Sequence, residues 1–547
     1  MKKLLTLVVA VLLAGVATAQ LSREQAERTG GVYYAYPTRM AARVAVPDGY
    51  EAFYISHYGR HGSRWLPSEE RYEWVMAQFA DDRNLTPLGK SAKRRLKEVC
   101  RNARGNAGQL TRLGERQHRA IAHRMSTNYP EVFEGDDTWI QARSSTVPRC
   151  RASMLAFCGE LQRCHRQLTI DPQTEPAFMA WLNHESDELK AFTRHVPSTQ
   201  MALQGGMNPD RFIRALFVDG TKVKEPLKLL SELHTIASDM QDIPLDINLW
   251  DLFSPEEMQA VHDANNVRMT LCNGDTLANE GIPARSSVPL WEDIERQADD
   301  IIARGGHGAT LRFGHDTSLY RLLTLLGVQL PADGMEDIVP MAANLQMVFF
   351  KKAGEAPQPD DVLVTFLLNE HPSGLGTLRN PSNPNTQSDR SNMRSQRKQS
   401  QLYYWSELKT YMHGRIHDLE HLRQLSALNT MVGTAPANTQ TAGLFGKGSE
   451  EHGQTLPAVL VPNGQTFWTP QTRDTERKCV APYYYQDTLF QGIRASQWLV
   501  GGCTQDYGSF TVGAKRAADY TGGTEGSRFS HAEEVSHPYY YAVRLPD

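Results

Sequence analysis

One histidine of the sequence, His61, lies in a glycine-bearing segment between two arginines. Arg60 precedes it and Arg64 follows three residues later, while Gly59 and Gly62 flank the pair. A guanidinium binds phosphate through two parallel N–H donors, and glycine lets a ligand approach the backbone closely. Neighbouring positive charges disfavour a protonated imidazole, so His61 should stay neutral and nucleophilic at mildly acid pH. The segment therefore predicts that His61 accepts a phosphoryl group.

Three later residues could complete such a site. Phosphoryl transfer without a metal needs fixed positive donors around the phosphate and an acid for the leaving oxygen. Arg143 follows a short apolar run and can add a third guanidinium. His315 can donate to the same phosphate, and Asp316 can protonate the leaving oxygen if its pKa is raised. We therefore expect no metal or other cofactor.

These residues all lie at the ends of predicted strands. An apolar strand at 52–57 runs into the His61 turn, and one at 139–142 ends at Arg143. A third strand at 311–314 delivers His315 and Asp316, with Thr317 as the expected helix cap by residue type. Helical patterns separate the strands. This alternation predicts an α/β fold that presents reactive groups at the carboxyl ends of its strands.

The chain is too long for one hydrophobic core, because single cores stop growing near about 300 residues. Residues 171–298 read mainly as helices and loops, which predicts a helical cap inserted into the α/β part. A helix at 404–425 closes this first unit. From about residue 428, Gly, Pro, Thr and Tyr become more frequent and short β-branched runs appear, which predicts a separate β-rich domain.

The N-terminus has the order of a secretory signal peptide. Met1-Lys2-Lys3 precedes an apolar run at 4–16 and the small residues 17–19, so we expect cleavage before Gln20. The run is shorter than the ~20 residues that span a bilayer. We therefore expect a periplasmic or secreted protein without a stable membrane span.

The overall charge and the cysteines set further bounds. The formal net charge of −4 gives no extended positive field, so we expect no nucleic-acid partner. Six of the seven cysteines could pair in an oxidising compartment, but their connectivity cannot be read from the sequence. None of them has the paired spacing of a zinc site.

The motifs together resemble those of a known family. R-H-G-S-R at 60–64, R-S-S-T at 143–146 with Arg149 beyond it, and G-H-D-T at 314–317 are similar to the histidine acid phosphatases. That family includes phytases, glucose-1-phosphatases and multiple inositol polyphosphate phosphatases. The last group typically carries H-A-E where this chain has H-D-T, so the proton donor resembles the phytase and glucose-1-phosphatase type.

The resemblance implies a three-layer histidine phosphatase fold with a helical cap over residues 20–427. It also implies a phosphohistidine on His61, with Asp316 as proton donor. Phosphate would be bound by Arg60, Arg64, Arg143 and His315. Inositol phosphates are the leading expected substrates, and sugar phosphates follow closely.

The last 120 or so residues resemble another family. H-G-Q-T-L-P-A at 452–458, S-Q-W-L-V-G-G-C-T-Q-D-Y-G-S at 496–509 and P-Y-Y-Y-A-V at 538–543 are similar to the N-terminal domain of glycoside hydrolase family 92, a family of calcium-dependent α-mannosidases. The resemblance implies a partial all-β sandwich over 428–547. Because the catalytic and calcium-binding residues of that family belong largely to a helical domain absent here, we expect no glycosidase activity.

Three questions remain open from the sequence. Trp498 could contact a carbohydrate or belong to the sandwich core. A link to mannan breakdown would make the substrate a phosphorylated sugar. A protein of another class, a non-catalytic carbohydrate-binding surface protein, would bind glycans without releasing phosphate.

Overall fold

The computed structural model describes residues 21–428, apart from 38–43, 45, 47, 136, 205–207, 332–333 and 377–401, and four two-residue strands beyond them. The chain divides into two units, Met1–Glu420 and His421–Asp547. The four strands of the second unit form two antiparallel pairs, β9 (Ala458–Val459) with β10 (Thr466–Phe467) and β11 (Thr472–Arg473) with β12 (Cys479–Val480). The predicted signal peptide and most of the predicted sandwich lie outside the described residues.

Within the described residues, eight strands form one mixed sheet in the order β3-β2-β4-β1-β5-β6-β7, and β8 pairs with β6. The strands are β1 (Tyr50–Arg60), β2 (Trp139–Ser144), β3 (Asp171–Gln173), β4 (Gly308–Gly314), β5 (Asn344–Lys352), β6 (Leu363–Leu368), β7 (His371–Ser373) and β8 (Tyr403–Tyr404). The first four strands of the order are parallel, and their register places Arg60 opposite Gly314 and Ser144 opposite Phe313. The ends of β1, β2 and β4 therefore meet at one edge of the sheet, which confirms the predicted α/β class.

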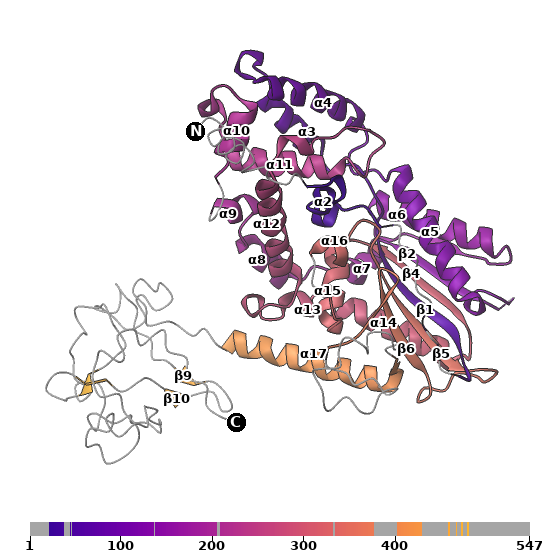
Figure 1. Cartoon of the computed structure of the whole chain (residues 1–547). Coiled ribbons are helices and arrows are strands. Elements are labelled where there is room, and N and C mark those ends of the chain that lie inside the picture. The colour runs from indigo at the N-terminus through magenta and orange to yellow at the C-terminus, as the bar shows by residue number, and fades with distance from the viewer. Residues whose placement is uncertain are drawn as a thin grey trace, which may run out of the picture. The chain divides into compact units, whose positions relative to one another are not determined.

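Helices cover both faces of the sheet (Figure 1). α5 (Arg112–Asn128) and α6 (Pro148–Cys164) lie on one face, and α14 (Val288–Ala303), α15 (Asp316–Leu326) and α17 (Trp405–Leu428) belong to the other layer. Successive side chains of β4 point to opposite faces of the sheet. Leu311 and Phe313 pack with Phe157 of α6 on one face, and Arg312 binds Asp293 of α14 on the other. This is the predicted three-layer arrangement.

A group of helices with its own apolar core forms the cap. Its elements are α2 (Arg23–Arg28), α3 (Glu69–Gln78), α4 (Pro87–Ala103), α8 (Asp187–His195), α9 (Thr199–Gln204), α10 (Asp210–Leu216), α11 (Pro226–Asp239) and α12 (Pro255–Asn273). Val75, Leu96, Phe212 and Leu229 from four of these helices share one buried cluster. The structure differs from the predicted segment 171–298 at both ends, because β3 joins the sheet and α14 packs on it.

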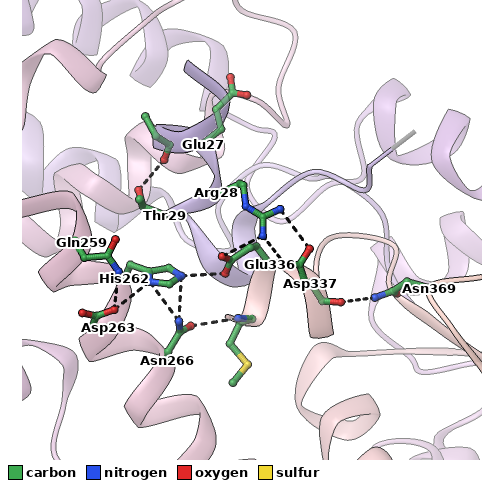
Figure 2. Close-up of polar contacts among 12 residues, drawn as sticks. Glu27, Arg28, Thr29, Gln259, His262, Asp263, Asn266, Glu336, Asp337 and Asn369 are labelled. Carbon is green, nitrogen blue, oxygen red and sulfur yellow. Dashed lines mark hydrogen bonds and ion pairs between the residues drawn. The ribbon is translucent and has the colours of Figure 1, made fainter. Parts of the chain in front are cut away.

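The short helices α7 (Met179–Leu182), α13 (Ile282–Arg285) and α16 (Met335–Ile338) complete this part. Figure 2 shows a polar network that ties α16 to the cap. His262 Nε2 of α12 lies 2.9 Å from Glu336 Oε2, and Arg28 of α2 bonds both carboxylate oxygens of Asp337. The side-chain amide of Asn369 donates to the Asp337 carbonyl at 2.9 Å. The network fixes α16, and carbonyl groups of the backbone directly after α16 accept hydrogen bonds from Arg60.

No described helix has the length and apolar content needed to cross a membrane. Among the described residues, the cysteines form no disulfide. The free thiols are Cys100, Cys150, Cys158, Cys164 and Cys272.

Candidate active site

His61 follows directly on the end of β1 and is buried. Backbone bonds hold it on both sides, since the Arg60 N–H donates to the Ala343 carbonyl at 2.7 Å and the His61 N–H donates to the Gly314 carbonyl at 3.0 Å. Nδ1 of His61 lies 3.0 Å from the Gly62 carbonyl. A carbonyl only accepts, so Nδ1 carries the hydrogen and Nε2 keeps its lone pair. Nε2 is therefore the nitrogen available for attack.

Glycine at position 62 lets the His61 loop sit against the starts of two helices. A Cβ added to Gly62 would lie 2.6 Å from the Cα of Gly114 in α5. The Gly62 N–H donates to Ser153 Oγ of α6 at 3.1 Å. Since no side chain fits at this distance, the backbone approach depends on glycine.

Two guanidinium groups flank His61, and both are buried. Arg60 Nη1 donates to the Val339 carbonyl at 2.7 Å, and its Nη2 lies 3.0 Å from Asp316 Oδ2. Arg64 Nη1 donates to Asp239 Oδ1 at 3.1 Å. These partners fix the positions of both guanidinium groups. The structure therefore places Arg60 and Arg64 beside His61, as the sequence predicts.

The prediction for Arg143 is wrong in the described structure. Its Nη1 lies 4.0 Å from Asp293 Oδ1 of α14, and its guanidinium stacks over the Phe178 ring at 4.8 Å. Arg149 supplies the third positive charge instead, and it is among the groups that lower the pKa of His61. Arg149 lies in the first turn of α6, where anions are favoured. Pro148 at the helix start is the sequence signal that could have pointed to it.

His315 and Asp316 come from the end of β4. Helix α15 begins at Asp316, so His315 is its N-cap and Thr317, the predicted cap, lies inside the helix. The His315 ring centroid is 5.7 Å from that of His61, and its Nε2 lies 3.3 Å from Ser145 Oγ. The structure thus brings His315 and Asp316 close to His61.

Burial and the arginines decide the charge states in the site. Burial, followed by the charges of Arg60 and Arg149, holds the pKa of His61 well below its ordinary value. Burial and Arg149 lower the pKa of His315 to about 4. Burial opposes ionisation of Asp316, but Arg60 and then His315 outweigh it and hold its pKa below the usual value. In the ligand-free protein, His61 is neutral and Asp316 is ionised, so the raised pKa expected for the proton donor is not present.

Two buried carboxyl groups lie behind the His61 loop, and the sequence pattern did not predict them. Asp239 and Asp242, at the end of α11, are fully buried. Asp242 Oδ1 accepts from Ser63 Oγ at 2.5 Å, and Asp239 Oδ2 accepts from the Tyr72 hydroxyl at 3.2 Å. Burial raises the pKa of Asp239 to about 6, and burial together with the neighbouring Asp239 raises that of Asp242 well above its usual value. The pair therefore holds a proton next to Arg64.

A neutral histidine, flanking arginines and a His-Asp pair at adjacent strand ends of a capped mixed sheet define the histidine phosphatase fold. The described part of the chain has this fold. It is similar to the Bifidobacterium longum multiple inositol polyphosphate phosphatase in complex with inositol hexasulfate, with a TM-score of 0.57 and 17% identity over 70% of this chain and 97% of that one. It is also similar to the phytase from D. castellii, with a TM-score of 0.53 and 13% identity over 74% of this chain and 89% of that one.

The C-terminal segment has a separate relationship. Residues 431–547 match the model of the glycosyl hydrolase family 92 N-terminal domain. No curated protein sequence matches the chain. The family model confirms the resemblance of the C-terminal segment, and the solved structures confirm the fold that the first resemblance implies.

Proposed function

We propose that the chain is an exported phosphomonoesterase that acts through a phosphohistidine on His61, with inositol polyphosphates as its leading substrates. One observation carries the proposal. The Nε–H groups of Arg60, Arg64 and Arg149 are buried without a hydrogen-bond partner among the described residues. A buried donor without a partner costs free energy unless a ligand satisfies it. Three such cationic donors near one neutral imidazole favour a phosphate group as that ligand.

Arg143 Nε is also buried without such a partner, but its contacts are with Asp293 and Phe178. The unpaired Nε–H group of Arg143 therefore lies beside α14 and not beside His61. This difference makes Arg143 a matched control for Arg149.

The chemical step follows from the lone pair on His61 Nε2. Nε2 bonds to phosphorus while the ester P–O bond breaks, and the arginines neutralise the charge on the non-bridging oxygens. A phosphate dianion would add negative charge beside Asp316 and compete for Arg60, which raises the pKa of that carboxyl. Asp316 then protonates the leaving oxygen. In the second step it accepts a proton from the water that attacks phosphorus as the P–N bond breaks.

Two similarities bear on the choice of substrate. A structure of similar fold is a multiple inositol polyphosphate phosphatase bound to inositol hexasulfate, which favours inositol phosphates. The match of 431–547 to a glycoside hydrolase domain favours a phosphorylated sugar as the second candidate. Carbohydrate contact by Trp498 belongs to this second candidate.

The test measures phosphate release from phytate, mannose 6-phosphate and glucose 1-phosphate at mildly acid pH with a chelator present. We expect chelator-resistant release that disappears in His61→Ala. Arg149→Ala should lose at least about a hundredfold in rate, whereas Arg143→Ala should stay within a few-fold of wild type. Equal losses in the two arginine variants would refute the assignment of Arg149. Glycan binding without any phosphate release would favour the non-catalytic alternative.

Export is proposed from the pattern of residues 1–19 alone. Expression of the full sequence in a bacterial host should give a periplasmic or secreted product that begins at Gln20. A product that keeps Met1 and stays in the cytoplasm would contradict this part of the proposal.

A further inference from the structure

Three side chains with the chemistry of metal ligands meet where α5 packs against α6. They are His123 of α5 and Glu160 and Cys164 of α6. Glu160 lies eleven residues along α6 from Arg149, which is about 16 Å at the rise of an α-helix. The cluster is therefore outside the phosphate site and takes no part in the chemistry proposed above.

The distances within the cluster suit a tetrahedral ion. His123 Nδ1 lies 3.4 Å from Cys164 Sγ and 3.6 Å from Glu160 Oε1, and Sγ lies 3.8 Å from the same Oε1. Ligands bound to Zn²⁺ at about 2.0 to 2.3 Å in a tetrahedron are roughly 3.3 to 3.6 Å apart. Shifts of a few tenths of an ångström would close the cluster around one ion.

Glu160 is the most buried of the three ligands. Its side chain is only 10% exposed, and Arg163 donates to both of its carboxylate oxygens. The Arg163 side chain is 65% exposed. Because this ion pair is bidentate and only its arginine is exposed, a metal ion has to compete with the guanidinium for Glu160.

We propose that His123, Glu160 and Cys164 form a Zn²⁺ site that clamps α5 to α6, with water as the fourth ligand. The Cys164 thiol gives up its proton on binding, so affinity rises with pH. Nitrogen, oxygen and thiolate ligands together suit Zn²⁺ better than Ca²⁺ or Mg²⁺, which prefer oxygen alone. The expectation that no cysteine pair binds zinc is compatible with this site, because its ligands come from two helices and include one cysteine.

The probe is Co²⁺ added to the reduced, metal-free full-length protein, followed by competition with Zn²⁺. We expect one Co²⁺ per chain, with a thiolate charge-transfer band in the near ultraviolet and the visible bands of tetrahedral cobalt. One equivalent of Zn²⁺ should abolish both. Absence of a saturable thiolate band would overturn the proposal.

Four variants assign the site. Cys164→Ser should abolish the thiolate band, and His123→Ala should weaken binding at least about a hundredfold, since even outer partners of metal ligands cost up to that much. Arg163→Gln should strengthen binding because it removes the competitor for Glu160. Cys100→Ser, a partly buried thiol in α4, should leave the spectrum unchanged. A band that survives Cys164→Ser would place the metal elsewhere in the chain and overturn the proposal.

Discussion

Replacing Asp242 by asparagine tests whether the buried carboxyl pair holds a proton. The side-chain oxygen of asparagine can still accept from Ser63 Oγ, as Asp242 Oδ1 does at 2.5 Å. In the wild type, Asp242 faces the carboxyl of Asp239 and the positive charges of Arg64 and Arg60. The amide keeps the shape of the protonated acid but cannot ionise, so the variant isolates the contribution of that proton.

The pKa values give the sign and the size of the effect. A carboxyl whose pKa is raised in the folded state contributes stability below its unfolded pKa and loses it as the pH rises through the folded value. For Asp239 the pKa rises from 3.8 to about 6, and the more strongly affected Asp242 shifts in the same direction. A shift of roughly two units corresponds to about 3 kcal/mol. Asp242→Asn should therefore gain stability over wild type as the pH is raised from about 4 to about 7, by an amount of the order set by the shift of Asp239.

The assay is urea unfolding followed by tryptophan fluorescence across this pH range. The control is Asp239→Asn, which leaves the buried guanidinium of Arg64 without its carboxylate partner. That variant should lose about 3 to 5 kcal/mol, with little recovery as the pH rises. A difference between Asp242→Asn and wild type that stays constant with pH would refute the shared proton.

Three more predictions follow from the same structure. Burial lowers the pKa of His262, but the contact with Glu336 outweighs it and raises the pKa above its ordinary value. The stability from this pair is therefore present below about pH 6.5 and is lost as the pH rises through the folded pKa. Thermal unfolding of His262→Gln should show a larger loss of stability at about pH 5 than at about pH 8. Gly62→Ala would place its Cβ against Gly114, so phosphate release should fall at least about tenfold even where far-ultraviolet circular dichroism is unchanged. Inorganic phosphate at a hundred times its Kd should stabilise the wild type by about 2.7 kcal/mol in thermal scans, and Arg149→Ala should show much less at the same concentration.

Local sequence patterns predicted the parts of the site that follow directly on strands. Arg60 ends β1, His61 follows it and Asp316 follows β4, and the parallel pairing of these strands brings them together. An apolar run bounded by a glycine-bearing turn is a local signal, so these positions could be read without the fold. The helical character of the cap was equally local.

The residues that sequence reasoning missed depend on packing between distant segments. Asp239 and Arg64 are 175 residues apart, and only the docking of α11 against the His61 loop joins them. Arg143 and Arg149 lie in one short motif, and choosing between them requires the direction of each side chain. Alternation along β2 sends Arg143 towards α14, whereas the turn into α6 sends Arg149 towards His61. The spacing of apolar residues predicts where a helix or strand lies. It does not predict which neighbouring layer covers each face of that helix or strand.

Burial and the charges of the site together keep His61 neutral by lowering its pKa. Arg60, Arg64 and Arg149 all disfavour a proton on His61, while Asp316 and the single charge shared by Asp239 and Asp242 offset only part of their positive charge. The ligand-free site therefore keeps about one excess positive charge in a buried setting, by formal count. Burying unpaired charge costs free energy, so a fold that retains it gains by binding a dianion. This excess of positive charge would thus favour a phosphate dianion over neutral ligands.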